Sequence, residues 1–392
     1  MEEVFVISAV RTAIGSFGGS LKKTKLADIA TLVVGEALKR ASVEPASVGH
    51  VVMGNVIPTE PRDAYLSRVA ALNSGIPVET PAFNVNRLCG SGLQAVLLAA
   101  QALRAGDADV VIGAGAEVMS RGPYMLDGAR WGERMGDGVV QDYMLGILHD
   151  PLSRIHMGIT AENVAAVDGI TREMQDELAW SSQQRAACAI AEGRFSSQIV
   201  PVEVKQGKKI ARFEIDEHVR SDVTQDQLAA MRPAFDKNGT VTAGNASGIN
   251  DGASALVLAN ERAVREHGLK PLARLVSWAH AGVDPSLMGL GPVPASRKAL
   301  ERAGLNVRDL SVIESNEAFA AQACAVSRRL EFDPALVNPN GSGISLGHPV
   351  GATGAIIATK AIHELHRTGG RYALATMCIG GGQGIAAIFE RV

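Results

Sequence analysis

Two cysteines in different glycine-rich settings are the residues of this chain best suited to chemistry. Cys89 lies in Asn86-Arg87-Leu88-Cys89-Gly90-Ser91-Gly92, and Cys378 lies in Met377-Cys378-Ile379-Gly380-Gly381-Gly382-Gln383-Gly384. Between them stand Asn316, in Asn316-Glu317-Ala318-Phe319-Ala320, and His348, in Gly347-His348-Pro349-Val350-Gly351. A nucleophilic thiol, a second thiol as acid and base, an imidazole and a water-binding amide are the groups that a carbon–carbon bond-forming acyltransferase needs.

Cys89 follows an extended apolar segment, residues 81–86, and directly precedes a predicted helix. Its sulfur is therefore expected near unpaired backbone N–H groups and the positive end of the helix dipole, which lowers a thiol pKa and favours thiolate. Taken alone, the motif is equally compatible with a small buried cysteine that only fills space. The companion motifs favour a nucleophile.

The chemistry suggests a role for each of these groups. Attack of Cys89 on a thioester exchanges one thioester for another, so an acyl group is stored reversibly. The next step removes a proton from an acetyl methyl group, and the enolate then needs a base and hydrogen-bond donors. Cys378 can be the base, while His348 Nε2 and a water held by Asn316 can be the donors. Backbone N–H groups near Cys89 and Gly380 can hold the acyl-enzyme carbonyl.

Each motif also has a purely structural interpretation. His348 could be a satisfied turn histidine, Asn316 could cap a helix from Ala318 to Arg328, and residues 380–384 could form a tight turn. Of the other two cysteines, Cys324 is assigned to packing. Cys188 falls within a helix predicted from Thr171 to Gly193, where it is expected to be a buried small residue.

Composition limits the class of protein. The 392 residues are 46% hydrophobic, enough to bury two or three cores, and the net charge of −3 makes a nucleic-acid partner unexpected. The four cysteines fit a reducing compartment and show no disulfide or metal-ligand spacing. With an acidic start and no apolar stretch longer than Leu93–Leu103, the sequence predicts a cytoplasmic protein without a membrane partner, metal or cofactor.

An internal repeat predicts the architecture. Residues 37–43 resemble residues 299–305 at an offset of 262, residues 50–55 resemble 311–316 at 261, and the segment from Cys89 resembles the segment from His348 at 259. Cys89 and His348 are thus expected at equivalent helix N-termini, brought together by a pseudo-twofold axis. One site would then be built from both halves.

The alternation of elements within each half predicts the fold class. Strands and amphipathic helices alternate, so each half should form a sheet covered on both faces, in an α/β chain with a duplicated five-layered α/β/α/β/α sandwich. Such segments are expected at Val4–Ser8, Leu26–Ala41, Val51–Gly54, Gly92–Ala105 and Val110–Gly113. The predicted domains are residues 1–118, completed by about 250–270, an inserted loop domain at 119–249, and residues 271–392. The start of the insert is rich in Met and Gly, which suits a pliable apolar surface or ordinary core filling.

Over its whole length, and through the four motifs together with the segment Asn340–Pro349, the chain resembles the thiolase family. It is most similar to bacterial biosynthetic β-ketothiolases, also called acetyl-CoA acetyltransferases. The resemblance implies that Cys89 is acylated, that Cys378 is the general acid and base, and that His348 activates Cys89 and shares an oxyanion hole with a water on Asn316. It implies coenzyme A as substrate and product, and a homotetramer.

The same resemblance implies which residues contact coenzyme A and the acyl group. Ser247 would meet the pantetheine arm, and Arg220 would lie near the nucleotide, although without the family it reads as a solvated side chain beside a lysine cluster. Methionines at 157 and 288 would close a small acyl pocket that takes acetyl groups and, as in ketothiolases supplying polyhydroxyalkanoate synthesis, propionyl groups. The implied contacts are His156, Met157, Arg220, Phe235, Ala243, Gly244, Ser247, Met288, Ala318 and Phe319.

Three rival interpretations remain open at this point. A decarboxylating ketoacyl synthase shares the duplicated fold but carries His where Cys378 stands. An enzyme that condenses acetyl-CoA onto acetoacetyl-CoA lacks the paired cysteines. From a different class, the chain could be a catalytically silent acyl-CoA-binding protein on the same fold, and failure to form an acyl-cysteine would favour that alternative.

Overall fold

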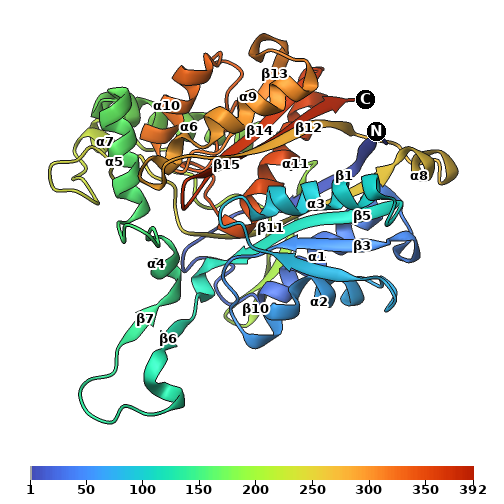
Figure 1. Cartoon of the computed structure of the whole chain (residues 1–392), viewed down its shortest axis with the longest axis horizontal. Coiled ribbons are helices and arrows are strands. Elements are labelled where there is room, and N and C mark those ends of the chain that lie inside the picture. Colours follow the sequence, from blue (N-terminus) through green and yellow to red (C-terminus); the bar gives the residue numbers. More distant parts are fainter. Residues whose placement is uncertain (1) are drawn as a thin grey trace.

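Two half-sheets, one from each end of the chain, form the framework of the molecule (Figure 1). The computed structural model describes residues 2–392. Strand order is β13-β14-β15-β12-β1-β11-β5-β3-β4. The half-sheets meet where β1 pairs with β12 through only two residue pairs, Phe5 with Arg274 and Val6 with Ala273.

The N-terminal half contributes the strands on one side of this junction. Its elements are β1 (Val4–Thr12), β2 (Gly15–Ser16), α1 (Leu26–Ala41), β3 (His50–Gly54), α2 (Leu66–Asn73), β4 (Ala82–Val85), α3 (Ser91–Ala105), β5 (Val110–Val118), β11 (Asn250–Asn260) and α8 (Glu261–Glu266). The C-terminal half supplies β12 (Ala273–Gly282), α9 (Pro292–Ala303), β13 (Leu310–Ser315), α10 (Ala320–Leu330), α11 (Val350–Thr368), β14 (Tyr372–Ile379) and β15 (Gln383–Arg391). The five segments expected from the sequence are therefore confirmed, with longer strands.

The layers are α/β/α/β/α, as predicted. Helices α3 and α11 lie between the half-sheets, where Leu97 and Ile357 pack with strand residues of both halves such as Val111 and Met377. The outer face of one half-sheet is covered by α1 and α2, and that of the other by α9 and α10. The two central helices pack so closely that a Cβ atom on Gly354 would lie 2.2 Å from the backbone nitrogen of Leu93.

Helix α3 is largely apolar because most of its residues are buried between the half-sheets. The 18-residue window Leu88–Ala105 has a mean hydropathy of 1.2, so by length and composition it would pass for a membrane span. Here it is a core helix, and it ends at Gly106, whose φ of +78° suits glycine.

Residues 119–249 pack around this framework. They form β6 (Tyr124–Leu126), β7 (Val140–Asp142), α4 (Tyr143–Ile147), α5 (Met157–Asp168), α6 (Arg172–Ala191), β8 (Ile199–Val200), β9 (Val202–Gln206), β10 (Lys209–Phe213) and α7 (Gln225–Ala229). Strand β8 pairs with β1 of the main sheet, and the β6–β7 hairpin projects away from the body (Figure 1). The Thr cap of α6 is confirmed, because Thr171 accepts from the Met174 N–H.

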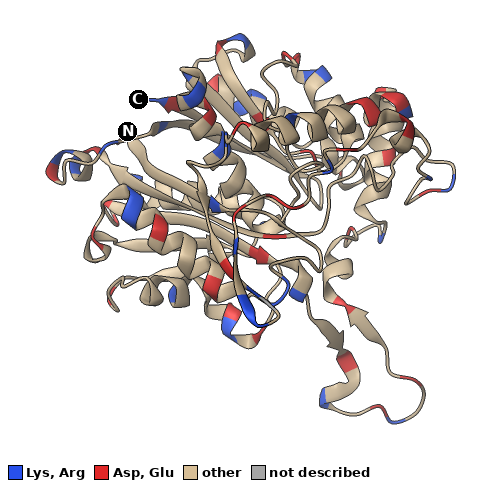
Figure 2. Cartoon of the chain, turned by 180° about the vertical axis from the view of Figure 1, so that it is seen from behind, with Lys and Arg blue, Asp and Glu red and all other residues tan. Residues whose placement is uncertain are grey.

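The two cysteines outside the reactive motifs differ in exposure. Cys188 is exposed rather than buried, because it lies on the outer face of α6, where its sulfur donates to Glu192. Cys324 is partly buried and packs against an apolar cluster, as expected. Acidic and basic residues are interspersed over the helices and loops seen in Figure 2.

Candidate active site

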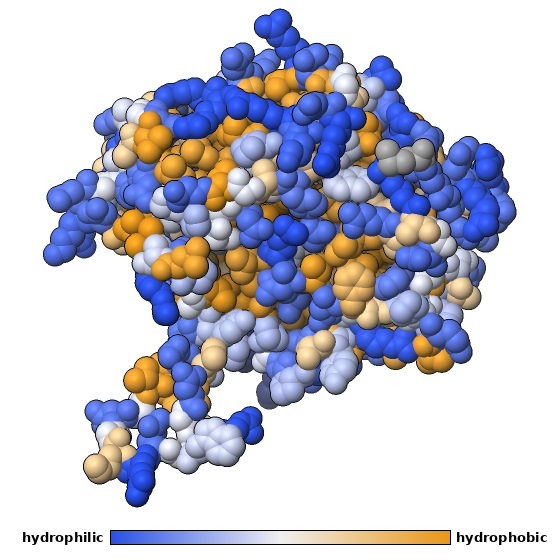
Figure 3. Space-filling view, viewed as in Figure 1, coloured by the Kyte–Doolittle hydropathy of each residue, from blue (hydrophilic) through white to orange (hydrophobic). Residues whose placement is uncertain are grey.

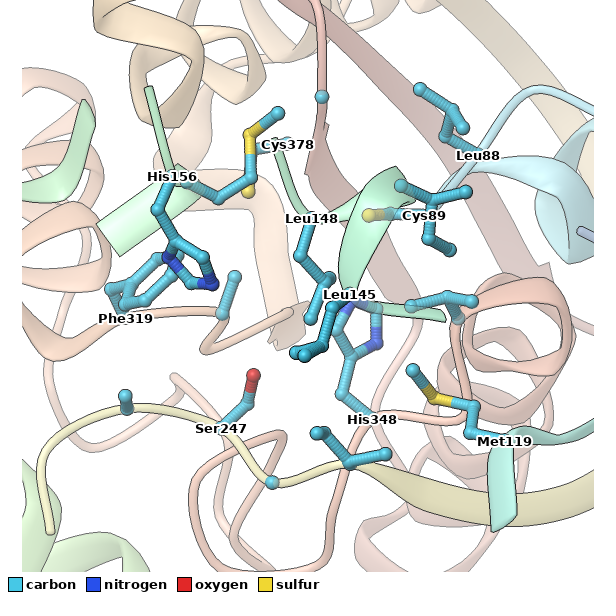
Figure 4. A pocket seen from close by; sticks show the side chains of 18 of the residues that line it. Leu88, Cys89, Met119, Leu145, Leu148, His156, Ser247, Phe319, His348 and Cys378 are labelled. Atoms are coloured by element: carbon cyan, nitrogen blue, oxygen red, sulfur yellow. The ribbon is translucent and has the colours of Figure 1, made fainter. Parts of the chain in front are cut away.

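One cavity of about 400 Å³ contains most of the residues singled out from the sequence (Figure 4). It lies where the two half-sheets and the 119–249 region meet. The predicted residues that line it are Cys89, His156, Met157, Arg220, Phe235, Ala243, Ser247, Met288, Ala318, Phe319, His348, Cys378 and Gly380. Side chains more than 250 residues apart in the sequence, such as Cys89 and Cys378, thus share one wall.

Cys89 stands at a strained bend that leads into α3. Leu88 before it has φ +47°, which is unusual for a residue with a side chain. The bend is held by local hydrogen bonds, because Asn86 Oδ1 accepts from the Leu88 N–H at 2.9 Å and Ser91 Oγ accepts from the Arg87 N–H at 2.8 Å. Strain fixed in this way is common at functional sites, and here it directs the thiol into the cavity.

The expected lowering of the Cys89 pKa is wrong. Burial raises the pKa of the Cys89 thiol above its ordinary value, while hydrogen bonds from the backbone N–H groups of Gly380 and Cys89 act in the opposite direction. The negative charge of Glu117 adds to the rise. Desolvation therefore outweighs the helix N-terminus, and Cys89 is a thiol that needs a base when it attacks.

His348 is arranged to be that base. Its ring is buried, and burial lowers its pKa to about 4, so the imidazole is neutral near pH 7. The Thr353 hydroxyl donates to the Pro349 carbonyl at 2.9 Å and lies 2.7 Å from His348 Nδ1. A hydroxyl that already donates must accept from Nδ1–H, which leaves the Nε2 lone pair free. Nε2 has no hydrogen-bond partner among the described residues.

Asn316 lies directly after β13 and is buried. Neither its amide nitrogen nor its amide oxygen has a hydrogen-bond partner among the described residues, which is rare for a buried amide. Helix α10 begins at Ala320 and is capped by Phe319 without a side-chain bond, so the capping interpretation of Asn316 is wrong. Asn316 does not itself line the cavity, but its free amide is suited to bind a water or a substrate oxygen.

Cys378 is the penultimate residue of β14 and is 1% exposed. Burial raises the pKa of its thiol, and the neighbouring Cys89 raises it further. The glycines that follow form the turn to β15, in which Gly381 and Gly382 have φ values of +79° and +81°. This turn brings the Gly380 N–H to the Cys89 sulfur.

Two methionines and an aromatic group form the other walls. Met157 and Met288 are both buried, and a Cβ on Gly380 would come within 3.2 Å of Met157 Cε, so the cavity is shallow beside the thiols. The rings of His156 and Phe235 stack at 4.6 Å. Such a wall suits a small acyl group rather than a long chain.

The polar contacts predicted for coenzyme A include Ser247, in the loop that follows α7, and Arg220, which precedes α7. The Ser247 N–H donates to the Ala318 carbonyl at 2.9 Å, which ties this loop to the Asn316 segment. Arg220 is exposed and lines the cavity. Gly244 does not line the main cavity, and instead lines a small recess beside it with Arg220 and Gln183.

The sequence interpretation missed several wall residues. Apolar side chains from the loop after β3, from and directly after α4, and from the start of α11 also line the cavity; they are Val56, Leu145, Ile147, Leu148 and Val350, with His218 as a polar addition. Single apolar residues in loops carry no periodic signal, so only the tertiary contacts identify them.

Comparisons with known proteins agree with this geometry. The N-terminal thiolase domain matches residues 4–262 and the C-terminal thiolase domain matches residues 269–391. The chain is 64% identical to beta-ketothiolase BktB of Cupriavidus necator over 100% of the chain and 99% of that protein. It is 52% identical to an acetyl-CoA acetyltransferase of Escherichia coli, with 100% of both chains covered.

A solved structure supports the same conclusion. The crystal structure of human mitochondrial 3-ketoacyl-CoA thiolase in complex with CoA has a TM-score of 0.97 and 44% identity, and the match covers 100% of this chain and 98% of that one. Domain match, relatives and fold all agree across the whole length. The chain therefore belongs to the thiolase family of acyltransferases.

Proposed function

We propose that this protein is an acetyl-CoA C-acyltransferase, a β-ketothiolase that condenses two short acyl-CoA molecules to a 3-ketoacyl-CoA and free CoA, and catalyses the reverse thiolysis. The observation that carries the proposal is the meeting of two thiols, a histidine with a free Nε2 and the turn at Gly380 around one shallow cavity. The relatives are named as enzymes, which does not favour the alternative of a silent acyl-CoA-binding protein.

In the first half-reaction, His348 Nε2 takes the Cys89 proton as the sulfur attacks the thioester carbonyl. A tetrahedral oxyanion forms, the bond to the CoA sulfur breaks, and the Cys378 thiol gives its proton to the leaving CoA sulfur. Cys378 is then a thiolate, and the proton taken from Cys89 stays on His348 Nε2. The buried, neutral imidazole is matched to a buried, neutral thiol, because charge appears only during attack. The Gly380 N–H beside the Cys89 sulfur is suited to stabilise the carbonyl oxygen of the acyl-enzyme.

In the second half-reaction, the Cys378 thiolate removes a proton from the methyl group of a second acetyl-CoA. The enolate carbon attacks the acyl-enzyme carbonyl, the carbon–carbon bond forms, and the Cys89 sulfur leaves and regains its proton from His348 Nε2. A buried thiolate with a raised pKa is a stronger base than an exposed one. The protonated His348 Nε2 and an Asn316-bound water are suited to donate to the enolate oxygen, since neither side chain has another partner among the described residues.

The residues that line the cavity indicate which substrates it accepts. Met157 and Met288 limit the acyl group to acetyl, propionyl and similar lengths, a range that suits supply of 3-ketoacyl units for polyhydroxyalkanoate synthesis. Ser247 faces the pantetheine arm, with His156, Phe235, Ala243, Gly244, Ala318 and Phe319 around it. Arg220, exposed at the rim, pairs with CoA phosphate. CoA is substrate and product, and the four side chains require no other cofactor.

Assembly and location form part of the same proposal. The projecting β6–β7 hairpin exposes large apolar side chains, with Trp131 88% and Met135 89% exposed, and apolar patches are visible on it in Figure 3. Apolar surface of this extent on a projecting element favours burial against other copies, so we assign a homotetramer built through this hairpin. All four cysteines are free thiols, which fits the reducing cytoplasm.

The proposal is tested by intact-protein mass spectrometry after mixing with acetoacetyl-CoA without free CoA. Wild type should gain one acetyl group, and peptide mapping should locate it on Cys89. Cys89→Ser should gain none. Mixed with acetyl-CoA instead, Cys378→Ser should gain the acetyl group on Cys89 but fail to condense it with a second acetyl-CoA. Acetoacetyl-CoA should acetylate Cys378→Ser poorly, because that reaction is the reverse of condensation and needs Cys378 to protonate the leaving carbon. The two variants are matched controls, because each changes one sulfur to oxygen in the same cavity.

Two results would overturn the assignment. Equal acetylation of wild type and Cys89→Ser would remove Cys89 as the nucleophile. A wild-type protein that binds acetoacetyl-CoA but stays unmodified would favour the binding-protein alternative.

A further inference from the structure

Strand registers relate one residue of the N-terminal half to the base of the C-terminal half. Gly54 of β3 pairs with Gly115 of β5, and Ser315 of β13 pairs with Thr376 of β14, in equivalent parallel ladders. Asn55 directly follows Gly54, and Asn316 directly follows Ser315. Glu117 lies two residues after Gly115, and Cys378 lies two residues after Thr376.

Neighbouring elements support the same equivalence. Glu117 pairs with Gly252 of the antiparallel strand β11, and Cys378 pairs with Gly384 of the antiparallel strand β15. Cys89 and His348 each lie two residues before their helix, α3 or α11. Asn55 and Glu117 therefore occupy, in the N-terminal half, the places that Asn316 and Cys378 occupy in the other.

Glu117 is fully buried and both of its oxygens accept two hydrogen bonds. Oε1 accepts from Asn55 Nδ2 at 2.8 Å and from the Ile57 N–H at 3.0 Å. Oε2 accepts from the Val56 N–H at 3.0 Å and from the Gly351 N–H at 2.9 Å. Four N–H donors around one carboxyl group form a built site, and these donors favour its ionised form against the effect of burial.

These donors come from two separate parts of the cavity. Val56 lines the cavity wall, whereas Gly351 lies in the first turn of α11, three residues after His348. The contact is tight, because a Cβ on Gly351 would come within 2.4 Å of Glu117 Oε2. Glu117 thus joins the wall at β3 to the start of the helix that carries the base.

Charged and titratable groups face Glu117 from the surrounding elements. Asp251 of β11 and Cys89 before α3 interact with it electrostatically, and His348 precedes α11. Burial raises the pKa of Glu117 to about 8, against its N–H donors, and Asp251 adds to the rise. The charge of Glu117 in turn raises the pKa of Cys89.

From this arrangement we infer that Glu117, held by Asn55, is a positioning residue for acyl transfer that fixes His348 against the cavity wall. In the alkaline range where Cys89 titrates, the ionised Glu117 also opposes loss of the Cys89 proton. The inference rests on the proposed function for its account of the reaction. Its consequence is that Cys89 stays a thiol until His348 removes the proton, so the nucleophile forms only during attack. Asn55 and Glu117 of the N-terminal half thereby support the half that carries their equivalents, Asn316 and Cys378.

The test compares Glu117→Gln with wild type by the pH dependence of Cys89 alkylation with iodoacetamide, followed by peptide mapping to separate Cys89 from the other cysteines. Removing the charge should move the midpoint for Cys89 to lower pH by about half a unit or more. The rate of acetylation by acetoacetyl-CoA should nevertheless fall about tenfold or more, because glutamine has one acceptor oxygen in place of two and cannot hold both the loop after β3 and the start of α11. A purely structural role would slow both reactions without moving the midpoint.

A second variant keeps the inference testable if Glu117→Gln does not fold. Asn55→Ala removes one donor and leaves the carboxylate, so acetylation should slow by a smaller factor. Asn260→Ala is the matched control, since Asn260 is an equally buried asparagine at the far end of β11 that caps α8. It should change neither the acetylation rate nor the alkylation midpoint.

An unchanged midpoint in folded Glu117→Gln, or equal acetylation rates in Asn55→Ala and wild type, would overturn the inference. Alkylation depends only on the thiol, so this result stands apart from the proposed function. That function would fail instead if wild type were never acetylated.

Discussion

At the scale of single residues, the position of one proton on His348 decides whether the site can work. Thr353 gives its own proton to the Pro349 carbonyl and accepts from Nδ1, so Nε2 faces the cavity as an acceptor. Burial keeps the ring neutral by lowering its pKa to about 4. A threonine that no catalytic motif includes therefore selects the tautomer that the first half-reaction needs.

Thr353→Val should slow acetylation of Cys89 by about tenfold to a hundredfold, because the isosteric side chain cannot accept from Nδ1 and the ring loses its fixed tautomer. Stopped-flow measurement of acetylation by acetoacetyl-CoA checks the rate. Thr353→Ser retains the hydroxyl and should recover most of the activity. Full activity in the valine variant would show that the tautomer is set by another group.

At the scale of elements, the β14–β15 turn determines where Gly380 lies. Gly382 has a φ of +81°, and a Cβ there would lie 2.3 Å from the Val283 carbonyl oxygen. Gly381 has a similar φ of +79°, but a Cβ there would meet nothing within 4 Å. The two positions share backbone strain and differ only in the space around them.

Gly382→Ala should therefore destabilise the protein more than Gly381→Ala, which should cost only about 1 kcal/mol of backbone strain. The larger cost at 382 comes from displacement of the segment around Val283. Urea denaturation of both variants measures the difference. Activity should fall further in Gly382→Ala, because the Gly380 N–H moves with the turn, and equal stability of the two variants would contradict this account.

At the scale of the whole molecule, buried titratable groups predict how stability depends on pH. Burial raises the pKa of Glu117 to about 8 and that of Glu314 to about 7. These groups keep a proton in the folded protein where the unfolded chain has lost it, so the stability they contribute is lost as the pH rises through those values. Buried or half-buried histidines such as His348, His218 and His280, with pKa values lowered to about 4, act oppositely, but only below pH 6.5.

Above pH 6.5 these histidines no longer affect the pH dependence of stability, and the two carboxyl groups determine it. The free energy of unfolding should therefore fall between pH 6.5 and 8.5 by roughly 2 to 3 kcal/mol. Urea denaturation at the two pH values measures this change. Most of the fall comes from Glu117, so Glu117→Gln should show a much smaller dependence on pH. A rise in stability over this interval would contradict the assignment.

The sequence by itself determined the elements, the duplication and the four reactive side chains. Periodicity predicted helices such as Leu26–Ala41, and the offset near 260 residues predicted that Cys89 and His348 stand before equivalent helices, as they do before α3 and α11. These properties depend on residues close together in the chain or on motifs repeated within it. They can therefore be read without knowing how distant segments pack.

Only the tertiary structure determined the properties that depend on contacts between residues far apart in the chain, such as pKa and exposure. The Cys89 pKa is raised rather than lowered, since desolvation by both half-sheets and the charge of Glu117 outweigh a helix N-terminus that the sequence does show. Cys188 proved exposed, and Asn316 caps no helix. Burial and electrostatic interaction depend on which residues meet in space, and the chain order of Cys89, Glu117 and Gly351 does not contain that information.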